Sequence, residues 1–468
     1  MSKQPSFGQS LILFVGMFLL LFVAMFVLKS EPHIPLLMGT AIVATLLYFF
    51  GFSWNELQEA MLKGIQSAIM PIIILGLIGV LIATWMMSGT VPTILYYGLE
   101  YINPQYFALS ALFITVVVSM FTGSSFTTVS TVGVALMGMA LAMEIDPLIA
   151  AGAIISGACF GDKMSPLSDT TNFASAVAGV PLFTHIGNLL YTTIPALILT
   201  AGFFIIVPQT GGIELSSIQN MKEALQDSFN IHILTILSPV AVLICSVLRK
   251  PILPTLMVGI VTGLLVTWLV QDNSSLSMWL QVMQSGYKGE VANDMVASIV
   301  HRGGLQSMTS SISLILIALA LGGLLQHCGV IRALFERVVK PLRNPSHMVL
   351  AAGSSSIAVN ALTGEQYLSI LLPGQMFKEE FKSRNIPMKT LSRTLEDCGT
   401  LINPLIPWGV SGAFFAATLG VPVIDYIPYA MFLWLSPIIT FIYAYMPKLK
   451  KISLGDAIVK KTPEAIQK

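Results

Sequence analysis

Apolar stretches of about 20 residues recur along most of the chain, and this recurrence constrains the fold more than any other feature. An α-helix of about that length crosses the hydrocarbon core of a bilayer. Only 10% of the residues are charged, whereas a soluble globular protein is nearer a quarter. The sequence therefore predicts an all-α polytopic membrane protein. The first apolar stretch, residues 11–28, is too long for a signal-peptide core, so we expect it to be a retained span.

Short motifs of the first half reappear in the second half, in the same order and at a nearly constant separation. The sequence GIQS at Gly64–Ser67, for example, corresponds to GLQS at Gly304–Ser307. The other pairs are Gly89 and Gly329, Asn103-Pro104 and Asn344-Pro345, Gly123 and Gly364, Cys159 and Cys398, Ser165-Pro166-Leu167 and Asn403-Pro404-Leu405, and Gly179 and Gly420. Together these matches predict an internal duplication.

We expect two repeats of inverted topology, each with about five transmembrane spans, a re-entrant hairpin and a helix broken at the midplane of the membrane. An odd number of crossings in each repeat is what inverts the second repeat. The predicted boundaries are 1–208 for the first repeat, 209–230 for an extracytoplasmic connection, 231–446 for the second repeat and 447–468 for a cytoplasmic tail. Hairpin tips are expected near 122–128 and 362–367, and broken helices near 161–170 and 397–408.

The basic residues support this topology. Most of the 24 Lys and Arg residues fall in segments that the inverted arrangement assigns to the cytoplasm. Loops on the cytoplasmic side of membrane proteins carry an excess of Lys and Arg. We therefore expect both termini in the cytoplasm. Only Lys29, Lys222, Lys288 and Arg302 fall on the outer side, and Lys163 falls within an apolar span.

The first predicted helix break, GDKMSPLSDTTN, begins at Gly161. Ionisable side chains within membrane spans are costly unless they are paired, protonated or hydrated, so they indicate a functional site. Asp162, Lys163 and Asp169 flank Ser165-Pro166, where proline interrupts the helix. The freed carbonyls, two carboxylates and nearby hydroxyls would suit Na⁺, which prefers oxygen ligands. The alternative is a structural ion pair of Lys163 with either aspartate.

The matching segment of the second repeat, EDCGTLINPLIPWG, starts at Glu396. It contains two further acidic or amide candidates, Asp397 and Asn403, and Pro404 breaks the helix. Asp397 and Asn403 are the stronger candidates, because Glu396 can lie at the cytoplasmic boundary beside Arg393.

Both expected hairpin tips contain a glycine that permits a tight turn, in FTGSSFTTVST and LTGEQY. The hydroxyls of Ser124, Ser125 and Thr363 are either ion ligands or packing groups that bond to the helix backbone. Glu365 is the stronger candidate, because its charge within an apolar region requires a reason.

No sequence motif of an enzyme or nucleotide-binding site is present in its required context, so we expect a transporter with no cofactor, driven by ion gradients. An intramembrane protease would need a nucleophile and a base on facing spans, and no convincing pair is visible. A passive channel is a further alternative, but two inverted halves with broken helices are typical of alternating access.

The motif GDKMSPLSDTTN resembles the NhaC family of bacterial Na⁺/H⁺ antiporters, within the larger ion-transporter superfamily. The resemblance implies an antiporter of the bacterial cell membrane that exchanges cytoplasmic Na⁺ for external H⁺ by alternating access. A homodimer is also expected, since dimers are common in that superfamily. The residues that the resemblance links to the cation are Asp162, Ser165, Asp169, Thr170, Thr171 and Asn172.

The same family includes proteins that resemble malate–lactate exchangers. The alternative function is therefore an Na⁺- and H⁺-coupled exchange of small carboxylates such as malate and lactate. Lys163 and Asn403 are the groups that could then bind the organic anion.

In either case we expect Asp162 and Asp169 to form a shared site for Na⁺ and H⁺, with Asp397 contributing from the second repeat. Na⁺ and H⁺ compete for a carboxylate, because a bound cation favours its ionised form and burial favours its neutral form. The remaining ligand candidates are Ser124, Ser125, Thr363, Glu365 and Asn403, and the residues with structural or coupling roles are Lys163, Pro166 and Pro404.

Overall fold

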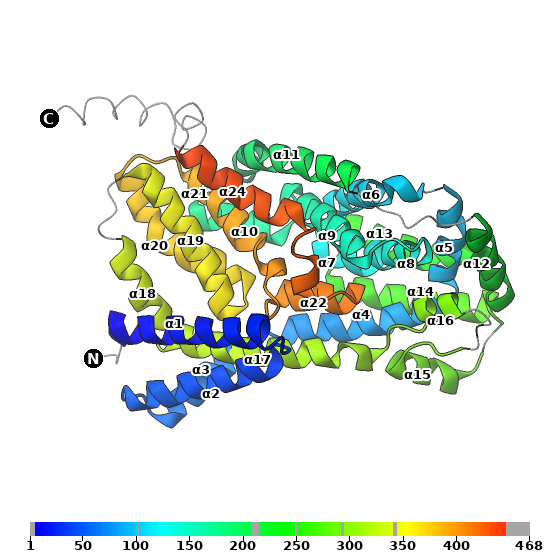
Figure 1. Ribbon diagram of the computed structural model, residues 1–468, viewed down its shortest axis with the longest axis horizontal. Coiled ribbons are helices and arrows are strands. Elements are labelled where there is room, and N and C mark those ends of the chain that lie inside the picture. The colour runs from blue at the N-terminus through cyan, green and yellow to red at the C-terminus, as the bar shows by residue number, and fades with distance from the viewer. Residues whose placement is uncertain are drawn as a thin grey trace.

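The computed structural model describes residues 5–445 except 102, 208–214, 249, 273, 290, 292–293 and 340–343, and these described residues form helices and loops with no strand. The first half contains α1 (Phe7–Phe22), η1 (Val23–Val27), α2 (His33–Phe49), α3 (Trp54–Gln66), α4 (Ile69–Met87), α5 (Thr90–Tyr101), η2 (Pro104–Tyr106), α6 (Phe107–Thr122), α7 (Ser125–Thr128), η3 (Val129–Gly133), α8 (Val134–Ala142), α9 (Pro147–Met164), α10 (Asp169–Ala178) and α11 (Leu182–Ile206) (Figure 1).

The second half continues with α12 (Leu215–Ser228), η4 (Ile233–Ile236), α13 (Leu237–Val247), α14 (Ile252–Val270), α15 (Leu276–Ser285), α16 (Asp294–Val300), η5 (Leu305–Met308), α17 (Thr309–His327), α18 (Val330–Val339), α19 (Pro345–Thr363), α20 (Gln366–Ser383), α21 (Met388–Leu395), η6 (Glu396–Thr400), η7 (Asn403–Leu405), α22 (Val410–Leu419), α23 (Val423–Tyr426) and α24 (Met431–Tyr445). The predicted tail, 447–468, lies outside the described residues, and α12 occupies most of the predicted connection.

Seven helices of the described residues are long and apolar enough to cross a membrane, and two bent helix pairs would raise this number to nine. The seven are Phe7–Met25, Ile69–Met87, Pro104–Thr122, Ser125–Ala142, Leu182–Ile206, Ile252–Val270 and Leu305–His327. One bent pair, Met388–Leu405 with Val410–Leu419, bends by 45° at the second predicted helix break. The chain is therefore a multi-pass membrane protein.

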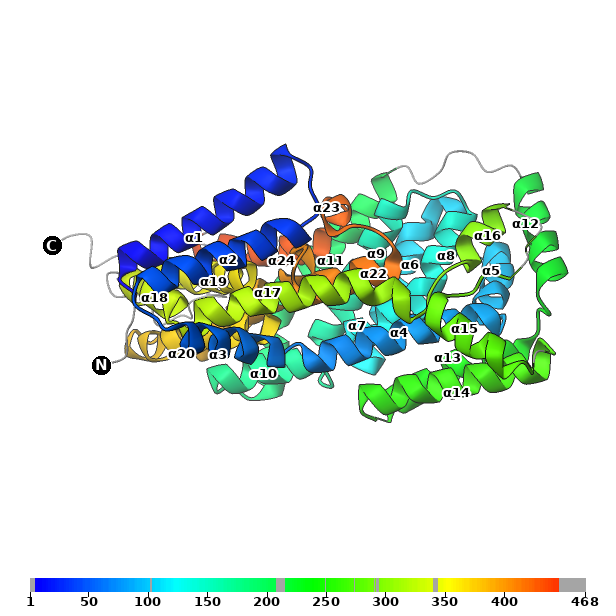
Figure 2. The ribbon, with the colours of Figure 1, turned by 90° about the horizontal axis from the view of Figure 1, so that it is seen from below.

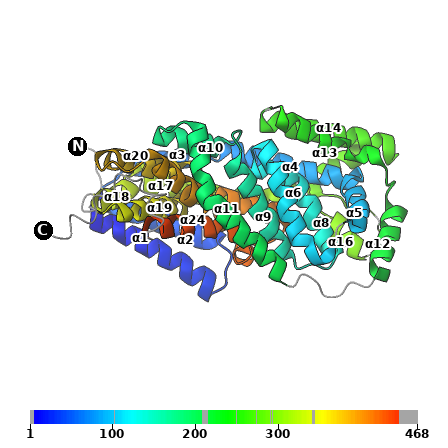
Figure 3. The ribbon, with the colours of Figure 1, turned by 90° about the horizontal axis from the view of Figure 1, so that it is seen from above.

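The described part of the molecule is elongated (Figure 1). Helices α1, α2, α3, α18 and α20 lie at the end that carries the N-terminus (Figure 2). Helices α12, α14, α15 and α16 lie at the opposite end (Figure 2), and a second view shows α12, α14 and α16 there (Figure 3). Helices α7, α9, α10 and α22, which adjoin the two helix breaks, lie between these ends (Figure 1).

Helices α6 and α9 pack closely because small residues line their contact. A Cβ atom at Gly157 would lie 2.2 Å from the carbonyl oxygen of Leu112, and one at Gly161 would lie 2.5 Å from that of Val116. The hydroxyl of Ser119 also donates to a backbone carbonyl of α9 at 2.6 Å. This packing holds the turn at the end of α6 beside the break at the end of α9.

Positions that the sequence matches between its two halves have matching backbone conformations. Asn103 and Asn344 each cap a helix by accepting the backbone N–H two residues later at 2.9 Å. Three glycine pairs adopt the left-handed region that favours glycine. Their φ angles are +72° and +77° at Gly89 and Gly329, +68° and +66° at Gly123 and Gly364, and +72° and +75° at Gly179 and Gly420.

Candidate functional site

A cavity of about 1030 Å³ extends between the glycine turns at Gly123 and Gly364 and the two helix breaks. Residues from distant parts of the sequence form its wall. The wall includes the candidates Ser124, Asp162, Asp169, Thr170, Asn172, Thr363 and Glu365, together with Tyr367 and Ser411. The basic residues of the wall are Lys63 of α3, Lys250 just before α14 and His327 at the end of α17. The acidic groups therefore gather beside the turns and breaks.

Asp162 lies in the last turn of α9 and is almost fully buried. Its Oδ2 atom accepts two hydrogen bonds from Ser125, one from the backbone N–H at 3.1 Å and one from the hydroxyl at 2.6 Å. Its buried Oδ1 atom has no hydrogen-bond partner among the described residues. A buried carboxylate oxygen is costly to leave unpaired, so a bound cation or proton would stabilise this oxygen.

Asp169 begins α10 on the other side of the break and is exposed at the cavity wall. Its Oδ1 atom accepts the backbone N–H of Thr170 at 2.9 Å. Its Oδ2 atom accepts a hydrogen bond from the hydroxyl of Tyr367, which lies in the first turn of α20. The ring of Tyr367 also contacts Phe173 edge to face, with ring centroids 5.4 Å apart. Asp169 thus joins the first helix break to the second glycine turn.

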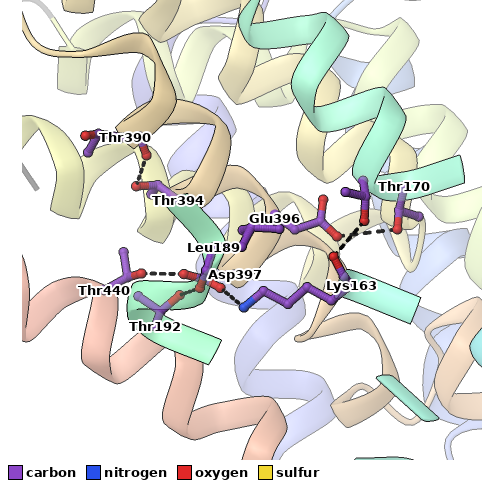
Figure 4. A network of polar contacts seen from close by, with 10 residues as sticks. Lys163, Thr170, Leu189, Thr192, Thr390, Thr394, Glu396, Asp397 and Thr440 are labelled. Atoms are coloured by element: carbon purple, nitrogen blue, oxygen red, sulfur yellow. Dashed lines mark hydrogen bonds and ion pairs between the residues drawn. The ribbon is translucent and has the colours of Figure 1, made fainter. Parts of the chain in front are cut away.

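Lys163 is fully buried, and its ammonium group donates to Oδ1 of Asp397, which is also fully buried (Figure 4). The hydroxyl of Thr440 donates to the other oxygen of Asp397. Neither of the partners that the sequence suggested for Lys163 is correct, because the side chain of Lys163 turns toward the second half of the protein. Both oxygens of Asp397 are therefore engaged, and Asp397 is not on the cavity wall.

Glu396, the acidic residue next to Asp397, was expected to be a weaker ion-binding candidate than Asp397 or Asn403. It is fully buried in η6, the π-helical continuation of α21. Its Oε1 atom accepts a hydrogen bond from the hydroxyl of Thr170 at 3.4 Å (Figure 4). Its buried Oε2 atom has no partner among the described residues. The carboxyl group of Glu396 therefore lies behind the cavity wall, in contact with Thr170 of the wall.

Asn403 connects the second break to the second turn. Its amide nitrogen donates to Oδ1 of Asn360 at 2.9 Å and to the carbonyl of Gly364 at 3.0 Å. Its amide oxygen accepts the backbone N–H of Ser411 at 2.8 Å. Glu365 caps α20, with one carboxylate oxygen accepting a backbone N–H of the first turn at 2.7 Å. The side chain of Asn403 is thus held by three hydrogen bonds, whereas Glu365 lies on the cavity wall.

Two polar residues after the first break donate hydrogen bonds to backbone carbonyls around it. Thr171 donates its hydroxyl to the carbonyl of Lys163 at 3.0 Å. Asn172 donates its amide to the carbonyls of Pro166 and Ser168, at 2.9 Å and 2.6 Å. Unpaired helix-end carbonyls need such partners inside a protein, so these contacts stabilise the broken conformation.

Three hydroxyl candidates are likewise bonded to the backbone. Ser165 donates to the carbonyl of Met120 at 2.8 Å, and Thr363 donates to a carbonyl of its own helix at 2.8 Å. Ser124 caps α7 by accepting the backbone N–H of Thr127 at 3.2 Å. Within the described residues, no cluster of three or more His, Cys, Asp or Glu side chains is arranged to hold a metal ion. A cation at this wall would therefore need hydroxyl or backbone oxygens beside the carboxylates.

Comparison with known proteins gives full-length matches. A family model described as the Na⁺/H⁺ antiporter family matches residues 157–447, which include both helix breaks. The Na⁺/H⁺ antiporter NhaC of Alkalihalophilus pseudofirmus is 51% identical, over 95% of this chain and 97% of the relative. NhaC of Bacillus subtilis is 45% identical, over 95% of this chain and 99% of the relative. The malate-2H⁺/Na⁺-lactate antiporter of Bacillus subtilis is 32% identical, over 94% of both chains.

Proposed function

The chain belongs to the Na⁺/H⁺ antiporter family, and from this membership and the cavity wall we propose that it is a secondary active Na⁺/H⁺ antiporter. It exchanges cytoplasmic Na⁺ for external H⁺ across the bacterial cell membrane. The observation that carries the proposal is the position of Asp162, Asp169 and Glu365, three acidic side chains from different elements on one cavity wall. Burying a carboxylate inside a membrane protein is costly, so buried carboxylates indicate a function such as an ion pathway.

In this proposal Na⁺ binds between Asp162 and Asp169, on the two sides of the first helix break. The free Oδ1 atom of Asp162 and the cavity-exposed carboxylate of Asp169 supply charged ligands. Hydroxyl oxygens of the wall, such as that of Thr170, complete a set of hard oxygen ligands. A proton and Na⁺ exclude each other at these carboxylates. Exchange follows if only the loaded protein changes between its inward and outward states.

We also infer that the two halves are inverted repeats, each with a re-entrant hairpin and a broken helix. The matching glycine turns and asparagine caps support this inference, because they occur in one order in both halves. Inverted repeats give a transporter two related conformations that open its central site to opposite sides. The distribution of Lys and Arg favours cytoplasmic termini.

Exchange of malate and lactate is less well supported, although a relative with that name is 32% identical. Lys163, a candidate for binding an organic anion, is fully buried and paired with Asp397. The amide of Asn403 is engaged by Asn360 and Gly364. The acidic side chains beside the turns would moreover repel a carboxylate substrate.

The test is proton movement in inside-out membrane vesicles that contain the full chain. Respiration first forms a pH gradient, and Na⁺ is then added alone or with malate and lactate on opposite sides. We expect Na⁺ alone to collapse the gradient. A gradient that collapses only when both organic acids are present would refute simple Na⁺/H⁺ exchange and support the carboxylate exchanger.

A substitution at Asp169 tests whether the exchange depends on the proposed Na⁺ site. We expect Asp169→Asn to abolish the response to Na⁺, because the amide lacks the charge that binds Na⁺ and cannot take up a proton in its place. Asp227→Asn, an exposed aspartate of α12, serves as the matched control and is expected to behave as the wild type. Full activity of Asp169→Asn, at equal protein levels in the membrane, would refute the assignment.

A further inference from the structure

Tyr367 connects the second half of the protein to the proposed Na⁺ site, although it was not among the candidates from the sequence. It lies in the first turn of α20 and on the cavity wall, and its hydroxyl donates to Oδ2 of Asp169. Among the described residues, no other side chain of the second half is hydrogen-bonded to Asp162 or Asp169. The second half therefore reaches these two carboxylates through one hydroxyl.

Matched positions in the two halves separate the role of the Tyr367 ring from that of its hydroxyl. Matched positions are those with the same separation in sequence as the two turn glycines. The ring of Tyr367 packs on Phe173 of α10, with centroids 5.4 Å apart. At the matched positions, Phe126 of α7 packs on Phe414 of α22, with centroids 4.3 Å apart. An aromatic ring without a hydroxyl therefore suffices for this packing.

The hydroxyl occurs in the half of the match that includes a carboxylate. Helices α10 and α22 each have 10 residues and are followed by a glycine of positive φ, so their first residues, Asp169 and Val410, are also matched. Tyr367 thus accompanies Asp169, whereas Phe126 accompanies Val410, which has no polar side chain. This difference indicates that the hydroxyl of Tyr367 serves the carboxylate and not the packing of the ring.

The hydrogen bonds of Asp169 fix its carboxylate and still leave positions for a cation. Its Oδ1 atom accepts the backbone N–H of Thr170 at 2.9 Å, and its Oδ2 atom accepts the hydroxyl of Tyr367. An ionised carboxylate offers about four acceptor positions, so each oxygen keeps one that is unused. Farther along the two helices, Nζ of Lys378 in α20 donates to the carbonyl of Val177 in α10 at 2.9 Å. Two helices that are joined at two places therefore hold the carboxylate in one orientation.

We propose that Tyr367 is a positioning residue of the Na⁺ site, whose hydroxyl holds the carboxylate of Asp169 in the orientation that binds the cation. This proposal rests on the proposed Na⁺/H⁺ exchange and names a residue of the second half on which the affinity for Na⁺ depends. Without the hydroxyl, the exposed carboxylate rotates more freely, and Na⁺ must order it on binding. The affinity for Na⁺ falls as a result, whereas the steps after binding are unchanged.

The test compares Tyr367→Phe with the wild type in inside-out vesicles that contain the full chain. Phenylalanine keeps the ring that packs on Phe173, and the matched position already has a phenylalanine, so the variant should fold. Proton movement is measured over a range of Na⁺ concentrations at one fixed pH. The maximal rate and the Na⁺ concentration that gives half of it are obtained at equal protein levels in the membrane.

We expect the half-maximal Na⁺ concentration of Tyr367→Phe to rise roughly two- to twelve-fold, which corresponds to the cost of ordering one side chain on binding. The maximal rate should not change, because the lost interaction affects Na⁺ binding alone. A residue that only supported the fold would instead lower the amount of active protein and thus the maximal rate. Tyr48→Phe, at an exposed tyrosine of α2, is the matched control and should change neither value.

An unchanged or lower half-maximal Na⁺ concentration in an active Tyr367→Phe variant would overturn the proposal. A fall in the maximal rate without a rise in the half-maximal concentration would also overturn it, since Tyr367 would then act after Na⁺ binds or only in folding. If the phenylalanine variant does not accumulate in the membrane, Tyr367→Leu removes the same hydroxyl, and the same two criteria apply. Absence of any Na⁺-dependent proton movement in the wild type would refute the proposed function instead.

Discussion

Removing one partner of the Lys163–Asp397 ion pair should destabilise the protein strongly. Both side chains are fully buried, and breaking such a pair costs about 3–5 kcal/mol because the remaining charge is left uncompensated. Asp397→Asn should be costlier than Lys163→Leu. Arg393 is also fully buried and lies one helical turn before Asp397, so loss of the carboxylate leaves two buried cations without compensation. Loss of the lysine leaves a carboxylate that still accepts from Thr440.

A double-mutant cycle measures this coupling. The free energy of unfolding is obtained by reversible chemical denaturation in detergent micelles for the wild type, Lys163→Leu, Asp397→Asn and the double variant Lys163→Leu/Asp397→Asn. We expect the double variant to lose about 2–3 kcal/mol less than the sum of the two single losses. The exposed pair Lys382 and Glu379 is the control, where coupling of about 0–1 kcal/mol is expected. Additive losses at Lys163 and Asp397 would refute the reasoning.

Three further predictions concern the turns, the second break and the cation. Gly123→Ala should lower stability by about 1–2 kcal/mol or more, and thus lower the unfolding temperature, because φ is +68° and the new Cβ would lie 2.5 Å from Cβ of Leu167. The control is Gly187→Ala, which has nothing within 4 Å of its new Cβ and should unfold at nearly the wild-type temperature. Asn403→Leu should cost about 3 kcal/mol or more in denaturant titrations, since three buried hydrogen bonds lose their partner. Na⁺ at 100 times its dissociation constant should stabilise the wild type by about 2.7 kcal/mol relative to a K⁺ control, and a similar gain in Asp169→Asn would contradict Na⁺ binding at that residue.

Local backbone chemistry explains which parts of the fold could be predicted. Pro166 lacks a backbone N–H, and the structure ends α9 two residues before it. Gly123 and Gly364 adopt positive φ angles at the ends of α6 and α19, where the sequence placed the two hairpin tips. Such features depend on one or two neighbouring residues and are therefore visible in the sequence. Asp162, Asp169 and Glu365, which line the cavity, lie in these same segments.

Long-range pairing explains what could not be predicted. Lys163 is adjacent in sequence to Asp162, yet consecutive helical residues point in directions about 100° apart and do not face each other. For the same reason Glu396 and Asp397 face different neighbours, Thr170 of α10 and Lys163 of α9. The burial of both Glu396 and Arg393 likewise depends on helices that are distant in the sequence. The adjacent pair of acids was a signal for two separate roles that the sequence analysis did not use.

The Lys163–Asp397 ion pair also has a consequence for synthesis of the protein. The two residues are 234 positions apart, and a ribosome that adds about 5–20 residues per second needs roughly 10–50 s to make the intervening chain. During this interval a growing chain holds an intramembrane lysine before its counter-charge has been translated, at a cost of about 2.5–3.5 kcal/mol on the scale of translocon insertion. A chain truncated before residue 397 never gains that counter-charge. Membrane quality-control proteases thus have a physical basis for distinguishing an aborted translation product from a complete one.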